Sequence, residues 1–320
     1  MTRYTLSRLL QGLVAMWVIV TIVFFLARLG GDAAALLAPA DATPEQIAAI
    51  RVSYGFDQPL YLQYVDYLRG IATLDFGQSV SYRQPVVDLV MPAMVNTARL
   101  ALAAFAIALV LGVTFGAIAG VRAGTRYDQA VRGLSVLGQS VPPFWLGMLL
   151  VLLFSINLGW LPAFGSEGFT SLILPACALA AFPLASIARL TRSSVLEIVA
   201  RDQTLFERSK GVGPATLMSH ILRNASLPVV TLAGIQLGAM FSGTIVVENL
   251  FAWPGVGQLA IQGIQARDFA LIQGIVVVNT FVFVALLFVV DLSYGWLDPR
   301  VRAIKTAVKS RVEATVEAAA

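Results

Sequence analysis

The sequence predicts an all-α integral membrane protein with six transmembrane helices and both termini in the cytoplasm. Three observations lead to this fold class: the composition, six long runs without charge, and the distribution of Lys and Arg. Of the 320 residues, 58% are hydrophobic and 12% are charged, and the mean hydropathy is +0.80. A soluble domain carries about a quarter charged residues, so a water-soluble fold is not expected.

Six uncharged runs are long enough to cross a bilayer. A hydrocarbon core of about 30 Å requires roughly 20 helical residues, because each residue rises about 1.5 Å. The first run is longer than the apolar part of a signal peptide, so we expect a retained helix. Pro142 and Pro143 are expected to bend the third run. The runs cover residues 9–27, 100–121, 134–158, 171–188, 229–247 and 271–290.

The positive residues alternate between the two sides of these spans. Cytoplasmic loops accumulate Lys and Arg, and sixteen of the 22 lie in the N-terminus, the second and fourth connections and the C-terminal tail. The third connection has none, and the fifth has only Arg267. Both termini are therefore predicted to be cytoplasmic.

This topology divides the chain into consecutive segments. The external segment carries a helix start at Thr43, Pro44 and Gln46, which combine an N-cap, a first-turn proline and a capping-box partner. The predicted segments are the cytoplasmic N-terminus with the first span (1–29), an external loop with short helices (30–97), a five-span core (98–299) that includes a cytoplasmic loop (189–228), and a cytoplasmic tail (300–320).

A second short helix is expected after Pro59. Tyr61, Tyr64 and Tyr67 recur at a spacing of three, so they share one face of this helix. That face either packs on the membrane domain or receives a partner that delivers a solute.

The cytoplasmic loop 189–228 is too long for a simple connection. Helix connections in bundles need about 2 to 8 residues. Its Leu and Val residues follow helical spacing, and Gly211, Gly213 and Pro214 interrupt the pattern. Two cytoplasmic helices that bind another protein are expected here.

Glycines and uncharged polar residues stand out within the spans. Gly112, Gly116 and Gly120 repeat every four residues, as do Gly234 and Gly238, which allows close packing of helices. Polar side chains in a span are expected to face protein or a water-filled path. Those of interest for a path are Gln236, Ser242 and Asn279.

Several kinds of site are not expected. Cys177 and His220 are the only cysteine and histidine, so neither a disulfide nor a metal centre is predicted. The chain lacks a GxxxxGK[ST] phosphate loop, so it would not bind ATP itself. No nucleic-acid partner is expected. A channel or ion-coupled transporter and a membrane enzyme are alternative classes, but the spans carry neither charges nor a catalytic constellation.

Several motifs resemble those of the permease subunits of dipeptide, oligopeptide and nickel ABC transporters. Segment 247–274 is similar to a family segment with a Glu, a Trp-Pro-Gly turn and an Ala-Arg-Asp triplet. Loop 189–228 resembles the family's EAA-type coupling motif, with its glycine at Gly211 and its closing Leu-Pro at Leu227 and Pro228. The segments FGQSVSYRQPV, PPFWLGMLL and DPRVR also match.

The resemblance implies the ABC importer type I permease fold and a place in the plasma (inner) membrane of a prokaryote. The chain would form half of a path for dipeptides, oligopeptides or similar small solutes, with nickel chelates, glutathione and haem as alternatives. Implied partners are a second homologous permease chain, one or two ATP-binding subunits, an external solute-binding protein and membrane lipid. No cofactor is expected on this chain, since ATP and Mg would be used by the partner subunits.

The resemblance also implies two groups of site residues and no catalytic or metal-binding residue. We expect Gly211 to permit a sharp turn toward the ATPase. We expect Glu248 and the 251–258 turn to form a structural cap at the external mouth, with direct contact to solute as the alternative. The coupling group is Glu207, Arg208, Ser209, Lys210, Gly211, Gly213, Leu227 and Pro228, and the path or gate group is Gln236, Ser242, Glu248, Trp253, Pro254, Gly255 and Asn279.

Overall fold

A computed structural model describes residues 2–29, 34, 42–53 and 55–297, and within these residues the chain is built from helices without a β-sheet. The predicted cytoplasmic tail, residues 300–320, lies entirely outside the described residues. The principal helices are α1 (Thr2–Leu29), α3 (Pro44–Ser53), α4 (Leu60–Thr73), α5 (Val86–Val121), α6 (Arg126–Ser140), α7 (Pro143–Leu150), the π-helix η1 (Val151–Asn157), α8 (Thr170–Val199), α9 (Asp202–Ser209), α10 (Pro214–Leu250), α11 (Val256–Gln265) and α12 (Phe269–Leu297).

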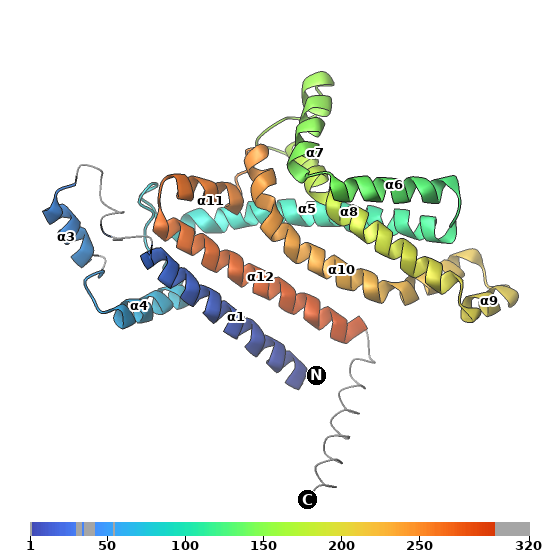
Figure 1. The fold of residues 1–320 in the computed structure, drawn as a ribbon, viewed down its shortest axis with the longest axis horizontal. Helices are drawn as coiled ribbons and strands as arrows, with labels where there is room; N and C mark the ends of the chain where they lie inside the picture. The colour runs from blue at the N-terminus through green and yellow to red at the C-terminus, as the bar shows by residue number, and fades with distance from the viewer. Residues whose placement is uncertain (1, 30–33, 35–41, 54, 298–320) are drawn as a thin grey trace, which may run out of the picture.

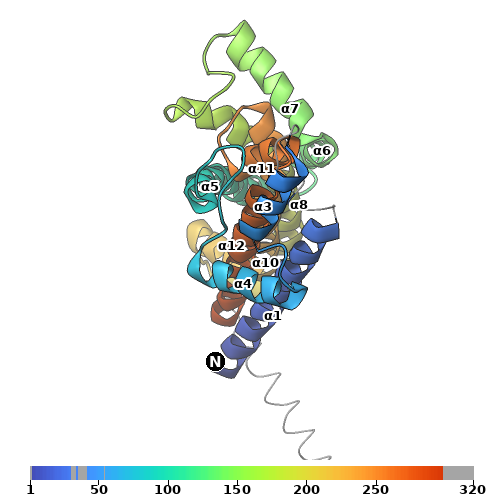
Figure 2. The ribbon, with the colours of Figure 1, turned by 90° about the vertical axis from the view of Figure 1, so that its left-hand side faces the viewer.

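The long helices α1, α5, α8, α10 and α12 run along the length of the molecule (Figure 1). Helices α3, α4 and α11 lie at one end, seen face-on in Figure 2, and α9 lies at the other. We call these the α11 end and the α9 end. The two groups of predicted site residues therefore have the whole length of the bundle between them.

The structure confirms the apolar spans and the predicted bend in the third. Five described helices are long and apolar enough to cross a membrane, or six if the bent pair of α6 and α7–η1 counts as one span. The pair bends by 107°, where Pro142 and Pro143 interrupt helical hydrogen bonding. The predicted run 134–158 is therefore not one straight helix, and α7 projects from the bundle in both views (Figures 1 and 2).

The predicted helix break at Gly211, Gly213 and Pro214 is confirmed, but residues 189–228 do not form a loop separate from the spans. Most of this segment extends two long helices, since α8 continues to Val199 and α10 begins at Pro214. Only α9 and its flanking turns, residues 200–213, stand between them. The charged residues at the end of each apolar run mark where the helix leaves the lipid. The helix itself continues, because charged residues are compatible with helical structure.

Among the described helices, α5 and α8 form the most extensive contact. A Cβ at Gly112 would lie 3.0 Å from the Cβ of Ile187, one at Gly116 would lie 2.8 Å from that of Thr191, and one at Gly120 would lie 2.8 Å from that of Val195. The predicted packing role of the glycine repeat is confirmed. Around this contact, α5, α8 and α10 share a buried core that includes Leu100, Leu174 and Val247.

The predicted helix starts of the 30–97 segment are confirmed. Helix α3 begins at Pro44, Thr43 Oγ1 accepts from the Gln46 amide (3.4 Å), and the Thr43 amide donates to Gln46 Oε1 (2.9 Å). On α4, Tyr64 shares a hydrogen bond with Thr21 of α1 (2.7 Å). The tyrosine face therefore packs partly on the membrane domain, while Tyr61 is exposed.

An ion pair that sequence analysis missed joins α6 to α8. Asp128 is buried and accepts hydrogen bonds from both Nε and Nη2 of Arg192, the latter at 2.8 Å. The Gly124 amide also donates to Asp128, at 3.0 Å. This pair fixes α6 beside α8 near the α9 end.

The close contact of α5 and α8 makes a stability prediction. Gly116→Leu should destabilise the protein by about 1–3 kcal/mol, because the new side chain overlaps the α8 backbone at Ala188. Thermal unfolding in detergent should show a lower midpoint. The control is Gly133→Ala on α6, where an added Cβ meets nothing within 4 Å, and its midpoint should not fall. Equal midpoints for the two variants would contradict the packing role.

Candidate functional site

The first candidate site is the turn between α8 and α10. The chain leaves α8 at Val199, forms α9, and reverses at Gly211, whose φ of +74° lies in the left-handed region. A Cβ at Gly211 would meet nothing within 4 Å. Glycine is therefore favoured here by the backbone conformation and not by lack of space.

Two side-chain contacts hold α9 against its neighbours. Thr204 is buried and donates through Oγ1 to the Ile198 carbonyl of α8 at 2.7 Å. Glu207 Oε2 lies 2.9 Å from His220 Nδ1 of α10, and Glu207 Oε1 accepts from Gln203 at 3.3 Å. The hydrogen bond to His220 is the main cause that holds the pKa of Glu207 below its ordinary value. Glu207 therefore connects α9 to α10. Its partner His220 was missed by sequence analysis.

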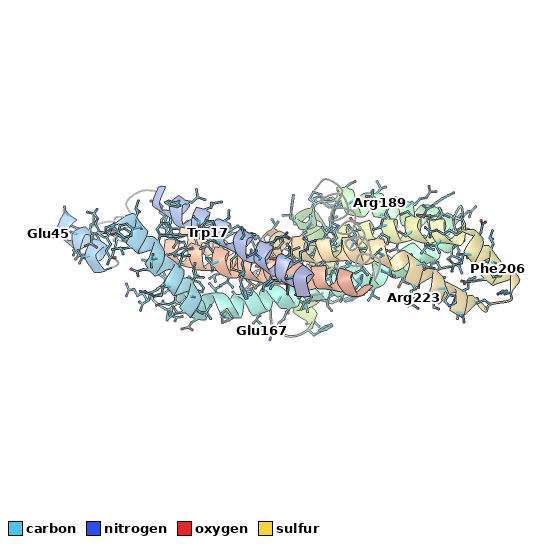
Figure 3. The ribbon with its side chains drawn as sticks, turned by 90° about the horizontal axis from the view of Figure 1, so that it is seen from below. Trp17, Glu45, Glu167, Arg189, Phe206 and Arg223 are labelled. Atoms are coloured by element: carbon cyan, nitrogen blue, oxygen red, sulfur yellow. The ribbon has the colours of Figure 1, made fainter. Side chains whose placement is uncertain are left out.

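The outer face of α9 is apolar and bordered by cations. Leu205 and Phe206 are 53% and 59% exposed, and Phe206 lies at the extreme end of the molecule (Figure 3). The ammonium group of Lys210 lies 4.4 Å from the centre of the Phe206 ring. Arg208 and Ser209 are exposed beside them. We call residues 205–210 the α9 tip; exposed apolar side chains ringed by charge are typical of a protein contact surface.

The remaining predicted coupling residues do not all belong to this tip. Gly213 is the N-cap position of α10 and is close to Gly211 along the chain. Leu227 and Pro228 are exposed inside α10. At about 1.5 Å per residue they lie roughly 20 Å along the helix from its start. The structure therefore separates the closing Leu-Pro from the turn.

The second candidate site is the carboxylate of Glu248 on the last turn of α10. This side chain is 0% exposed. Its Oε1 accepts from Thr97 Oγ1 of α5 at 2.6 Å, and its Oε2 accepts from the amides of Gly257 (2.7 Å) and Gln258 (3.2 Å). These amides belong to the first turn of α11, where the helix has no internal acceptors for them. One carboxylate thus joins α5, α10 and α11.

The intervening turn fits around this carboxylate. Trp253 is buried and donates from Nε1 to the Asn96 carbonyl (3.0 Å), and Asn96 Nδ2 donates to the Pro254 carbonyl (3.0 Å). A Cβ at Gly255 would overlap the Glu248 carboxylate, so glycine is required for this close approach. The geometry is that of a structural cap.

Asn96 and Thr97 were missed by sequence analysis. Thr97 is buried, and besides donating to Glu248 it accepts from the Val256 amide at 2.8 Å. The signal for them in the sequence was an adjacent polar pair separated from the apolar run 100–121 by only two residues.

A second buried carboxylate, Asp268, completes the α11 end. Its Oδ2 accepts from Ser79 Oγ (2.6 Å) and the Ser81 amide (3.1 Å), and its Oδ1 accepts from the Leu271 amide in the first turn of α12 (3.1 Å). Asp268 is 0% exposed. Two motifs that lie far apart in the sequence, FGQSVSYRQPV and Ala-Arg-Asp, are therefore one structural unit.

That the polar residues within the spans line the translocation path remains a prediction. Gln236 on α10 and Asn279 on α12 are half-buried, and the side chain of Ser242 lies outside those described. Among the described side chains, neither Gln236 nor Asn279 is a hydrogen-bond partner of Glu248. Within the described residues, no group of three or more His, Cys, Asp or Glu could hold a metal ion.

Known proteins resemble this chain over nearly its whole length. The family described as "Binding-protein-dependent transport system inner membrane component" matches residues 112–303, and the family describing the N-terminal part of such components matches residues 1–101. A putative peptide transport system permease protein of Brucella abortus (strain 2308) is 39% identical, with 94% of this chain and 99% of the relative covered. The glutathione transport system permease protein GsiC of Escherichia coli (strain K12) is 36% identical with the same coverage.

A solved structure shares the fold. The MetNI methionine ABC transporter in an inward-facing conformation contains a chain that matches with a TM-score of 0.55 and 18% identity. The match covers 66% of this chain and 96% of the other. At this identity the likeness concerns the fold alone.

The Glu248 cap makes a prediction about stability. Glu248→Ala leaves Thr97 and two helix amides without their acceptor, so it should destabilise the protein by about 2–4 kcal/mol. The measurement is the thermal unfolding midpoint in detergent. Glu197→Ala is the matched control, because Glu197 is exposed and its pair with Arg201, the N-cap residue of α9, is exposed as well, and it should change stability by less than about 0.5 kcal/mol. A Glu248→Ala midpoint equal to that of the control would contradict the cap.

The contact between Glu207 and His220 makes a prediction about local order. His220→Ala should speed hydrogen exchange in α9 at pH 7, while Ser219→Ala, which loses only a bond within its own helix, should not. Because the pKa of Glu207 is lowered in the fold, its contribution is present above the unfolded pKa and is lost as the pH falls through the folded pKa. Wild-type α9 should therefore loosen in acid after correction for intrinsic exchange. Unchanged exchange in His220→Ala would show that the contact does not hold α9.

Proposed function

The chain belongs to the family of binding-protein-dependent transport system inner membrane components and is a multi-pass permease subunit of an ABC importer, and from this we propose that it carries dipeptides or oligopeptides. The relatives named for peptide and glutathione transport support this cargo, since glutathione is itself a small peptide. The uncharged amides of Gln236 and Asn279 are compatible with it, because they can donate to and accept from peptide groups. Nickel chelates and haem are alternatives that the same family resemblance leaves open.

The observation that carries the mechanism is the continuity of α10. This helix begins three residues after Gly211, at Pro214, and its last turn carries Glu248. At about 1.5 Å per residue, its 37 residues extend roughly 55 Å. We propose that an ATP-binding subunit contacts the α9 tip and moves α10, and that this movement opens or closes the path near α11.

The proposed assembly contains the partners that this chain needs. A second homologous permease would supply the other half of the path, and one or two ATP-binding subunits would use ATP and Mg. An external solute-binding protein would deliver the solute to the α11 end. In this assembly the apolar α9 tip, with its exposed Leu205 and Phe206, is the contact with the ATPase.

Reconstitution tests this proposal. The tagged chain would be expressed with its native neighbours, purified in mild detergent, and its stoichiometric partners identified by mass spectrometry. Proteoliposomes of the complex would then be assayed with ATP and the binding protein for uptake of a labelled dipeptide, a labelled oligopeptide, glutathione, a nickel chelate and haem. We expect ATP-dependent peptide uptake. Solute passage by the isolated chain without ATP would contradict the proposal, and uptake restricted to nickel or haem would contradict the cargo.

The reversal at Gly211 makes a prediction about coupling. Gly211→Glu should abolish most ATP-driven uptake, because the left-handed backbone disfavours Glu and the added side chain stands where the ATPase would approach. Gly213→Ala is the control, since Gly213 has a φ of −62° and open space around it, and should retain uptake. Wild-type uptake and assembly in Gly211→Glu would show that this turn does not couple the ATPase.

A further inference from the structure

Two exposed arginines at the α11 end occupy unusual backbone conformations. Arg83 has a φ of 54° and Arg267 a φ of 55°, and both side chains are exposed. The left-handed region costs a residue with a Cβ about 1–2 kcal/mol, whereas glycine and asparagine adopt it more easily. The backbone alone therefore gives no reason for arginine at either position.

The buried carboxylate of Asp268 brings the two arginines into one structural unit. Asp268 directly follows Arg267 and accepts from Ser79 and from the Ser81 amide. The Arg83 amide donates to the Ser79 carbonyl at 2.9 Å, which closes the loop around the same serine. This loop and the turn between α11 and α12 lie together at the end of the molecule that faces the viewer in Figure 2.

Neither guanidinium has an acidic partner within the described part of the chain. The neighbouring Arg69 pairs with Asp66 at 3.5 Å, but neither Arg83 nor Arg267 forms such a pair among the described residues. The carboxylate of Asp268 is already occupied by two serines and the Leu271 amide. Arg267 is also the only positive residue between α10 and α12, at an end of the bundle where the positive-inside rule disfavours positive charge.

We propose that Arg83 and Arg267 form a docking site for carboxylates on the surface of the soluble solute-binding protein. The inference rests on the proposed function, which places that protein at the α11 end. A guanidinium binds a carboxylate with two parallel hydrogen bonds. Exposed charges of this kind guide association and make it sensitive to salt. The strained loops hold both groups on the surface, beside the helix that Glu248 caps.

The experiment uses the complete transporter in nanodiscs and its own binding protein. Arg83→Asn and Arg267→Asn remove the charges but suit the left-handed backbone, so the loops should keep their shape. The double variant should bind the solute-free binding protein roughly threefold to tenfold more weakly at low salt and show a shallower salt dependence. ATP hydrolysis without the binding protein should be unchanged, and excess binding protein should restore uptake. Arg69→Asn is the control and should bind as the wild type does.

Other outcomes distinguish this site from the proposed function. If wild-type uptake needs the binding protein but the double variant docks with unchanged affinity and salt dependence, the docking site is wrong and the function stands. A second outcome is that docking is unchanged, but an unlabelled peptide inhibits uptake of the labelled solute by the wild type and not by the double variant. The arginines would then bind the carboxylate of the solute, which also overturns the proposal. If the binding protein stimulates no uptake by the wild type, the proposed function itself fails.

Discussion

The fold depends on how the three buried carboxylates among the described residues are hydrogen-bonded. A buried ionised carboxylate is costly unless it is fully hydrogen-bonded, and in this chain each one is bonded across elements. Glu248 joins α10 to α5 and α11, Asp268 joins the start of α12 to the loop before α5, and Asp128 joins α6 to α8. In lipid, apolar burial gives little preference for one helix pair over another. These polar contacts therefore fix which helix ends meet, while the glycine contacts of α5 with α8 fix how closely they pack.

This arrangement explains how one chain can join two distant sites. The α9 tip is carried on the ends of α8 and α10, and α10 continues without interruption to Glu248. Because Glu248 binds the first turn of α11 directly, the proposed displacement of α10 would act on that turn. The α9 tip itself is fastened to both helices, through Thr204 to α8 and through Glu207 to α10. In the proposed mechanism, a push on α9 would therefore be passed to both helices.

Much of this organisation could be predicted from local sequence patterns. Run length and Pro142 and Pro143 predicted the spans and the bend, and the capping box predicted the start of α3 at Pro44. The extent of α8 and α10 could not be predicted, because hydropathy marks where lipid ends and not where a helix ends. Thr97 and His220 were missed because their partners lie 151 and 13 residues away in the chain. The separation of Leu227 and Pro228 from Gly211 likewise follows from the continuous α10, which no local motif reveals.

The central claim is that the α9 tip and the α11 end face opposite sides of the membrane. It is tested by labelling single cysteines in a Cys177→Ala background with a maleimide that cannot cross the membrane. Tyr61→Cys on α4 and Phe206→Cys on α9 would be compared in intact spheroplasts and in lysed ones. We predict that Tyr61→Cys is labelled in both and Phe206→Cys only after lysis. Labelling of Phe206→Cys in intact spheroplasts would contradict the orientation on which the proposed mechanism depends.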